Sequence, residues 1–260
     1  MKKQQTRIEI LKEWVKRERE ETQILLRCIP ATTVSLFVVS VVCMNLLANK
    51  TLFQNTYLAL DGGFLISWLS FMCMDMITKY FGPKASNRIA ILASVINLLT
   101  CAIFYIVSII PSNVDDYTAL DEIFGGTWFI LLGSTIAFLV SAAINNFLNW
   151  TIGKAFHKNP DGKLAYATQA YVSTFVGQFF DNLIFSLIVF AGFAPIFWDG
   201  FHWTVLQCTA CALTGAVAEL IINDLGSQVF DMTVSVLPSF FNEDDIVFFL
   251  VPVDGGRIPE

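Results

Sequence analysis

The chain has 260 residues, of which 55% are hydrophobic and 15% are charged. A soluble domain typically carries about 25% charged residues, so this composition excludes an ordinary soluble globular domain and indicates a chain embedded in lipid. The net charge is −6, and the sequence has no basic face of the kind that binds nucleic acid. We therefore expect the lipid bilayer, and not a nucleic acid, to be a partner of this protein.

Six long apolar blocks follow one another along the chain. A block of about 18 or more apolar residues with few charges is typical of a membrane-spanning helix. Because no water reaches the hydrocarbon region, each block must satisfy its own backbone hydrogen bonds by forming a helix. We therefore predict an all-α, polytopic membrane protein, a bundle of six transmembrane helices at residues 29–48, 58–77, 89–110, 128–150, 171–198 and 202–222.

Lysine and arginine residues alternate between the two sides of these blocks. Eight precede the first block and one follows it; three lie between the second and third, none between the third and fourth, three between the fourth and fifth, and none between the fifth and sixth. Cytoplasmic loops retain positive charge, so we predict a multi-pass protein of the cell (plasma) membrane with a cytoplasmic N-terminus and C-terminus. The first 27 residues are too charged for a signal peptide, and the first block should remain as an anchor.

The blocks divide the chain into three regions. We predict a charged, amphipathic cytoplasmic segment at residues 1–28, a transmembrane domain at 29–237 and a cytoplasmic tail at 238–260. The first region mixes apolar side chains such as Leu11 and Trp14 with many charges, which suits either a helix on the inner leaflet or a solvated lead-in. After residue 222 the helical spacing of apolar residues continues, which would extend the sixth helix or fold it back.

Two of the six cysteines, Cys208 and Cys211, form a C-x-x-C pair of the kind found in redox and metal sites. No second pair and no histidine cluster accompanies it, and residues three apart lie on one face of a helix. We therefore expect these cysteines to pack as small hydrophobic side chains. The sequence predicts no metal and no cofactor.

The strongest candidate for a functional residue is Asp181, near the middle of the fifth block. An Asp at the centre of a spanning helix costs roughly 2.5 to 3.5 kcal/mol, so such a residue faces the interior of the bundle and is a functional candidate. Gln178 lies on the same face, and Asn182 follows Asp181 directly. A polar clamp between helices, worth about 0.6 kcal/mol, is the alternative. Because a clamp seldom needs an ionisable group, we favour binding of a neutral or cationic solute.

Other polar residues extend this candidate site. Asp75 lies four residues before Lys79, so it either forms an ordinary acid-to-base pair on the helix surface or belongs to the site. Glu219 is the deepest acidic residue of the sixth block, and either Asp181 or Glu219 could carry a coupling proton or ion. Asn45 and Asn49 share one face of the first helix.

Several short motifs occur in a characteristic order: residues 45–50 (NLLANK), 75–78 (DMIT) ending at Gly82, 137–140 (AFLV), then Gln178, Asp181 with Asn182, and Phe185. In their order and spacing they resemble the queuosine precursor transporters, also called VUT proteins, over about 150 residues from the first helix to the end of the fifth. The resemblance implies an architecture similar to the substrate-binding subunits of energy-coupling-factor transporters. It also implies import of a 7-deazapurine, with a substrate cleft formed by Asn45, Asn49, Asp75, Thr78, Gln178, Asp181 and Asn182.

The sequence departs from this pattern at three positions: Lys79 stands where the pattern has Glu, Ala142 where it has Gln, and Asn145 where it has Asp. We predict a transporter of a small nucleobase-like solute. The alternative is a substrate-binding or scaffold subunit for another, vitamin-like molecule that works with a separate energising partner. Whether the chain forms a homo-oligomer is left open. No H-E-x-x-H, G-x-S-x-G or zinc spacing indicates an enzyme.

Overall fold

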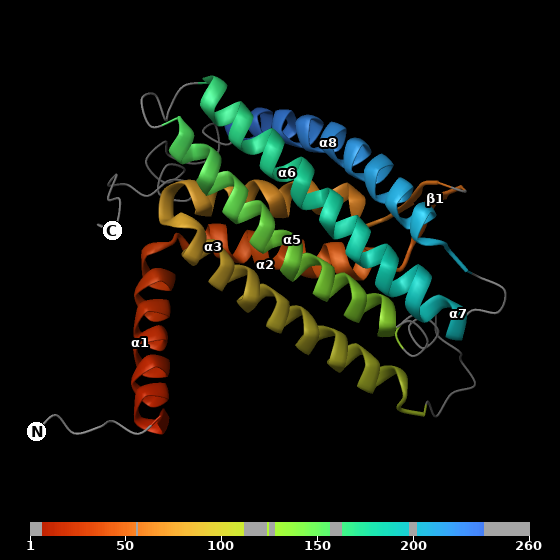
Figure 1. Ribbon diagram of the computed structural model, residues 1–260, viewed down its shortest axis with the longest axis horizontal. Helices are drawn as coiled ribbons and strands as arrows, with labels where there is room; N and C mark the ends of the chain where they lie inside the picture. The colour runs from red at the N-terminus through yellow and green to blue at the C-terminus, as the bar shows by residue number, and fades with distance from the viewer. Residues whose placement is uncertain are drawn as a thin grey trace, which may run out of the picture.

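The computed structural model describes residues 7–55, 57–111, 124, 128–156, 163–197 and 202–236. In Figure 1 the chain forms a bundle of long helices, with a small hairpin of two strands at one end and a separate helix at the other. In chain order the elements are α1 (Arg7–Cys28), α2 (Ala31–Leu47), β1 (Thr51–Gln54), β2 (Ala59–Asp61), α3 (Phe64–Ser108), α5 (Trp128–Ala155), α6 (Lys163–Ser186), the π-helix η1 (Leu187–Phe193), α7 (Ala194–Phe197) and α8 (Val205–Val236).

The six predicted apolar blocks fall on α2, the two halves of α3, α5, the continuous α6–η1–α7 segment, and α8. Among the described residues, four helices are long and apolar enough to cross a membrane, or five if the bent pair α1–α2 counts as one span. The longest of them, α3, has 45 residues, or about 68 Å at 1.5 Å per residue, roughly twice the thickness of the hydrocarbon core. The prediction of a helical, multi-pass membrane protein is confirmed.

A break at Gly82 divides α3 into its two halves. Gly82 has φ 82° and ψ 164°, a backbone conformation that is readily available only to glycine. Pro83 follows, and because its ring fixes φ and removes an N–H group it cannot continue the preceding helix. The chain therefore turns back at this point, as Figure 1 shows. We call this break the elbow, and the end of the bundle where it lies the elbow side.

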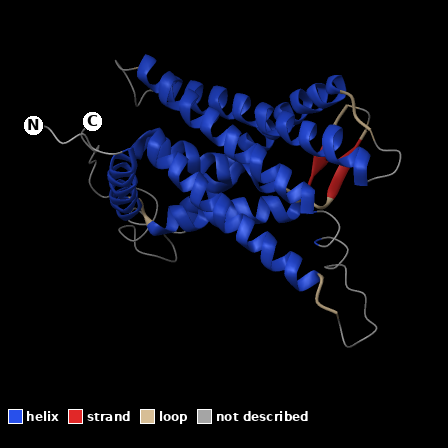
Figure 2. Ribbon diagram, turned by 60° about the horizontal axis from the view of Figure 1, so that its bottom comes forward, coloured by secondary structure: helices blue, strands red, loops and turns tan. Residues whose placement is uncertain are grey.

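The opposite end of the bundle carries the antiparallel pair β1–β2, in which Gln54 pairs with Ala59 and Thr51 with Asp61 (Figure 2). We call this end the hairpin side.

The start that we predicted for the second helix, at residue 58, was wrong. Residues Ala59–Asp61 form strand β2, and α3 begins only at Phe64.

Two glycines explain the late start of α3. A Cβ atom at Gly63 would lie 2.5 Å from the carbonyl oxygen of Met44, and one at Gly62 would lie 2.7 Å from that of Leu47. The chain can therefore turn this closely past the end of α2 only with glycine at both positions. Asp61 Oδ1 then accepts the N–H groups of Gly63 at 2.8 Å and Phe64 at 3.3 Å, which satisfies donors at the start of α3.

The apolar core lies between α2, α3 and α5. It contains fully buried residues such as Phe37, Met74 and Ile77, together with Phe138 of α5. Further along the sequence, α5 packs against α6, and α6 against α8. Two faces of α6 are thus covered by neighbouring helices, so the polar side chains on this helix must find partners inside the protein.

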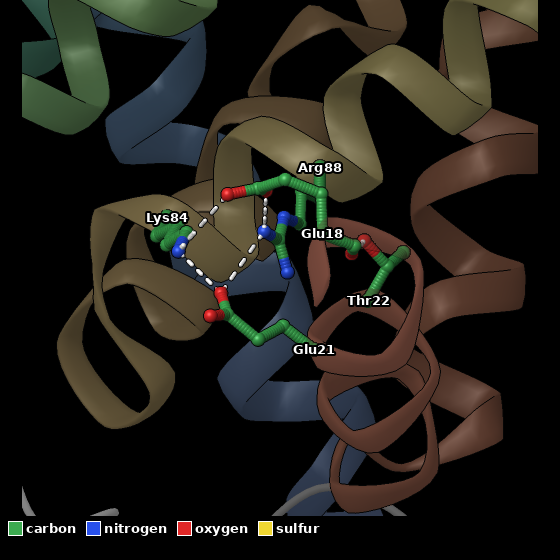
Figure 3. A network of polar contacts seen from close by, with 5 residues as sticks. All are labelled: Glu18, Glu21, Thr22, Lys84 and Arg88. Atoms are coloured by element: carbon green, nitrogen blue, oxygen red, sulfur yellow. Dashed lines mark hydrogen bonds and ion pairs between the residues drawn. The ribbon is translucent and has the colours of Figure 1, made fainter. Parts of the chain in front are cut away.

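Helix α1 leaves the bundle at 103° to α2, and side chains of α1 bind the elbow (Figure 3). The carboxylates of Glu18 and Glu21 both bind the guanidinium of Arg88, and both also lie within ion-pair distance of Lys84. The side chain of Arg88 is only 12% exposed, so this cation is largely withdrawn from water. The hydrogen bond from Lys84 is the main reason why the pKa of Glu21 is lowered.

We predict that Arg88→Met releases α1 from the elbow, because both glutamates lose the more buried of their two common partners and keep only the exposed Lys84. The expected cost is about 1–2 kcal/mol, between the values for an exposed and a buried ion pair. Hydrogen exchange should accelerate across Leu11–Cys28 while α5 and α6 stay protected. The control is Lys16→Met, which removes the exposed Lys16–Glu20 pair and should change nothing. Equal protection of α1 in both variants would contradict this account of the network.

Candidate functional site

The polar face of α6 is the centre of the candidate site. Thr174, Gln178 and Asp181 are spaced at i, i+4 and i+7 on this helix and therefore lie on one face. Asn182 lies beside Asp181. This face runs between α5 and α8, which both pack on α6, and the partners of each side chain come from those helices and from α3.

At the elbow end of this face, Asp75 of α3 collects hydrogen bonds from two neighbouring helices. Its Oδ1 atom accepts the amide groups of Asn145 at 2.9 Å and Asn149 at 3.1 Å, both on α5. Its Oδ2 atom accepts the hydroxyl of Thr174 on α6 at 3.2 Å. Asp75 thus joins three helices, and its described hydrogen bonds go to amides and a hydroxyl.

Asp75 and Thr174 also line a cavity of about 300 Å³, which we call the elbow pocket. This volume is at the lower end of the range for small-molecule sites. Two aromatic side chains, Trp68 and Tyr171, and the polar residues Asn223 and Asp224 complete its functional lining. The Tyr171 hydroxyl donates to Asp224 Oδ1 at 2.6 Å, which connects α6 to α8 at the pocket.

Sequence reasoning placed Asp75 in the site but missed the two aromatic residues. The sequence does contain a pattern that links Trp68 to Asp75. Trp68, Met72 and Asp75 are spaced at i, i+4 and i+7 and therefore share a face of α3. The same rule brings Tyr171 together with Thr174 on α6. Aromatic residues are abundant in this chain, with 24 Phe and 6 Trp, and spacing alone could not separate these two from those that face lipid.

A second cavity, of about 200 Å³, lies at the other end of the polar face. We call it the hairpin pocket, because β1 and β2 form much of its wall. The structure brings two of the predicted site residues together here, Asn49 from the end of α2 and Asn182 from α6, and it adds Asp61 from β2. Asn182 donates its amide to Glu219 Oε2 of α8 at 3.3 Å, so Glu219 contacts a residue that lines this pocket.

Gln178 and Asp181 lie between the residues of the two pockets along α6. Asp181 Oδ1 accepts the hydroxyl of Ser141 on α5 at 2.8 Å, and Asp181 retains some exposed surface. Gln178 is fully buried, yet neither atom of its amide has a hydrogen-bond partner among the described residues. The Oδ1 atom of Asn145 is unpaired in the same sense. Such groups are rare in native proteins, and each calls for an explanation.

Like Gln178, Asp181 and Glu219, the predicted site residues Asn45 and Thr78 line neither of the two pockets. Asn45 is buried, and its amide donates to Cys101 Sγ at 3.5 Å. The Thr78 hydroxyl donates to Asn146 Oδ1 at 3.0 Å, and the Ser86 hydroxyl donates to the same atom at 3.0 Å. Because Thr78 and Ser86 lie on opposite halves of α3, Asn146 holds the two halves together at the elbow. These contacts give Thr78 a role in packing. Asn45 also packs in the core, but its Oδ1 atom, like that of Asn145, has no hydrogen-bond partner among the described residues.

The two cysteines of the C-x-x-C pair are free and buried where α8 meets the hairpin. The backbone N–H of Ala59 donates to Cys211 Sγ at 3.3 Å, and Cys208 packs within the same cluster. In the part of the chain that the structure describes, no group of three His, Cys, Asp or Glu side chains is arranged to hold a metal ion. The site consists of carboxylates, amides and aromatic rings.

Three carboxylates lie near the hairpin pocket: Asp61 of β2, Asp181 of α6 and Glu219 of α8. Of these, Asp61 lies outside the membrane-spanning helices. Burial raises the pKa of its carboxyl to about 6, against the opposing effect of the N–H groups of Gly63 and Phe64.

A helical bundle that crosses the membrane several times, with a pocket at each end of a buried polar face, has the architecture expected of a small-solute membrane transporter. The chain matches the family model described as "Putative vitamin uptake transporter" over residues 61–237. This is more than half of its length, and the protein belongs to that family. The predicted family resemblance is confirmed, and the family is one of transporters and not of enzymes.

A relative from Bacillus subtilis (strain 168), described as "Probable queuosine precursor transporter", is 29% identical over 156 residues. The aligned region covers 59% of this chain and 66% of that protein, slightly less than two thirds of the relative's length. No solved structure matches the chain.

We predict that stability falls as the pH rises from about 4 to 6, because Asp61 holds its proton more tightly in the folded protein than in the unfolded chain, where its pKa is near 3.8. In this pH window the folded state binds more protons than the unfolded chain. The free energy of unfolding therefore falls by up to about 3 kcal/mol by pH 6, and Asp61 causes no further change above that pH. Thermal unfolding of the purified protein across this range should show the decline, and Asp61→Asn should remove it. A pH profile that is identical in the variant would refute this assignment.

Proposed function

We propose that the protein imports a small, planar, nucleobase-like solute, a 7-deazapurine precursor of queuosine, across the plasma membrane. The observation that carries this proposal is the buried polar face of α6, which leads from one pocket to the other and contains an unpaired amide, Gln178, between them. In this proposal the elbow side, with α1 and its basic residues, is cytoplasmic, since cytoplasmic segments retain positive charge.

The chemistry of the two pockets suits such a solute. A deazapurine presents donors and acceptors along one edge and an apolar ring face. In the elbow pocket the ring would lie against Trp68 and Tyr171, and its edge would meet Asp75 and Asn223. In the hairpin pocket Asn49 and Asn182 offer amides beside Phe185 and Phe190. Each pocket could therefore hold the same solute in one of two alternating states.

The middle of the polar face of α6, between the two pockets, has side chains that suit transient binding of the solute. Gln178 can donate two hydrogen bonds and accept two, and a passing solute would satisfy them. Asp181 lies one turn further, bonded only to Ser141 among the described contacts. We assign Asp181, together with Glu219, which contacts Asn182 of the hairpin pocket, to coupling with a proton or ion. The name of the Bacillus subtilis relative supports the substrate class.

The test of this function is uptake by the full chain in a bacterial strain that cannot make 7-deazapurines, followed by uptake into liposomes that contain the purified protein alone. Transport in both systems is expected. Transport in cells but not in liposomes would show that a separate energising partner is required. No uptake in cells and no binding by the purified protein would reject the substrate.

We predict that Gln178→Met stabilises the protein while abolishing uptake. A buried amide without partners costs about 1–3 kcal/mol, and a methionine of similar length removes that cost together with the contacts to the solute. The matched control on the same helix is Gln169→Met, because Gln169 Nε2 donates to the carbonyl oxygen of Asn149 at 3.3 Å and its replacement should destabilise the protein. Thermal unfolding and uptake are measured for both. A destabilised Gln178→Met variant would show that Gln178 serves the fold.

A further inference from the structure

The N-terminal half of α1 carries apolar side chains on its surface. Leu11, Trp14 and Val15 are spaced at i, i+3 and i+4 and therefore lie on one face of the helix. These three residues are 60%, 51% and 52% exposed. A contiguous apolar patch that includes a tryptophan is typical of a surface that binds another protein or a membrane. We call Leu11, Trp14 and Val15 the α1 stripe.

The direction of the α1 stripe follows from residues further along the same face. Glu18 lies seven residues after Leu11, and its carboxylate binds Arg88 at the elbow (Figure 3). Leu25 lies seven residues after Glu18 and packs against the apolar core. Because residues seven apart share a face of a helix, the α1 stripe points to the side of α1 on which the bundle lies.

Helix α1 runs beyond the bundle, across the direction of the other helices. It makes an angle of 103° with α2, and it extends about 16 Å past Glu18 at 1.5 Å per residue. Figure 1 shows this N-terminal half of α1 projecting away from the bundled helices. Since α2 and the helices packed on it cross the membrane, α1 lies nearly parallel to the plane of the bilayer. The space that the α1 stripe faces, beside the bundle, is therefore occupied by lipid.

Two aromatic side chains at the elbow ends of α5 and α3 mark the level of the membrane surface. Trp150 and Tyr80 are 39% and 43% exposed, and tryptophan and tyrosine collect at the boundary between lipid and water. The ammonium group of Lys154 lies 3.7 Å from the ring centroid of Trp150, and that of Lys79 lies 5.7 Å from the ring centroid of Tyr80. Lysines near helix ends extend to the level of the headgroups. Tyr80 lies just before the elbow to which α1 binds, so α1 lies at this level too.

Basic side chains border the α1 stripe on both edges. At roughly 100° per residue, Lys12 and Arg19 lie on one edge and Arg17 lies on the other, and all three residues are exposed. The face opposite the stripe carries the ion pair between Lys16 and Glu20. Helices that lie in the membrane interface have apolar residues on one face and basic residues among the polar ones. A lead-in surrounded by water would place no constraint on this arrangement.

We propose that α1 is an interfacial anchor that binds anionic phospholipids in the leaflet on the elbow side. The α1 stripe lies at the boundary between headgroups and acyl chains, and Lys12, Arg17 and Arg19 contact the lipid phosphates along its edges. The ion pairs with the elbow hold α1 at this depth. This inference concerns the lipid partner of the protein and does not depend on the identity of its solute.

The experiment places an environment-sensitive fluorophore on each face of α1 in the full chain. Leu11→Cys carries the label on the α1 stripe, and Lys16→Cys, its matched control, carries it on the opposite side; both residues are exposed. Both variants also contain Cys28→Ser, because the native Cys28 is exposed, and the Cys28→Ser parent gives the background. In nanodiscs of phosphatidylcholine with about one third phosphatidylglycerol, whose surface is negative, a lipid-borne nitroxide should quench the Leu11 label and aqueous iodide should not. The Lys16 label should show the reverse.

Two results would overturn the proposal. Equal access of iodide to both labels would show that the α1 stripe lies in water. A Leu11 label that is shielded from iodide, yet not quenched by the lipid-borne nitroxide, would show that protein covers the stripe, either residues 237–260 of this chain or a second copy.

The contact with anionic headgroups is tested with two variants that lose the same charge, each carrying the Leu11 label. Arg19→Gln removes a base at the edge of the α1 stripe and should lower the ratio of lipid-bound to water-exposed α1 about fivefold, the effect of one base near an anionic surface. Lys16→Gln removes a base from the opposite face and should change this ratio less than about twofold, because salt screens a charge that lies further from the lipid. In nanodiscs of phosphatidylcholine alone the two variants should behave alike. An equal effect of both variants on the anionic nanodiscs, or an effect of Arg19→Gln that persists without anionic lipid, would refute the assigned contact.

Discussion

One constraint organises this structure: a polar side chain at bilayer depth must find its partner inside the protein, because lipid offers none. Polar side chains of α5 meet this requirement by bonding to residues of α3 and α6. Asn149 and Asn145 of α5 reach Asp75, and Ser141 reaches Asp181. Close packing makes these bonds possible, since a Cβ atom at Gly177 of α6 would lie 3.0 Å from the Cβ of Asn145. On these two helices the exceptions among the described residues are Gln178 and one atom of Asn145, and the fold alone does not explain them.

The two ends of the polar face are built differently. The elbow pocket is formed by side chains of three regular helices, whereas the hairpin pocket is bordered by two short strands and by the π-helix η1. π-helical segments occur frequently at functional sites, and η1 places Phe190 against Trp203 with ring centroids 4.8 Å apart. Irregular backbone at membrane depth is tolerated where it borders a cavity or is covered by protein, and both conditions apply at this end.

The three departures from the family pattern have different consequences. Ala142 belongs to the core between α2, α3 and α5, and Lys79 has its ammonium group 5.7 Å from the ring of Tyr80. Only Asn145 touches the candidate site. An aspartate there would set a second carboxylate against Asp75, whereas the amide of Asn145 donates to it. The group beside Asp75 at this position is thus a neutral amide that donates to it.

The sequence by itself determined the class of fold, the order of the helices and the acidic residues that required an explanation. Hydropathy is sufficient for this, because the bilayer permits little other than helices and makes each buried charge costly. Only the tertiary structure decided that Asp75 shares a pocket with Trp68 and Tyr171, that Asn45 and Thr78 pack elsewhere, and that a hairpin replaces the start of the second predicted helix. These outcomes depend on how each helix is rotated and how closely it approaches its neighbours, down to the contact of Gly63 with the carbonyl oxygen of Met44, and no local pattern of residues encodes such distances.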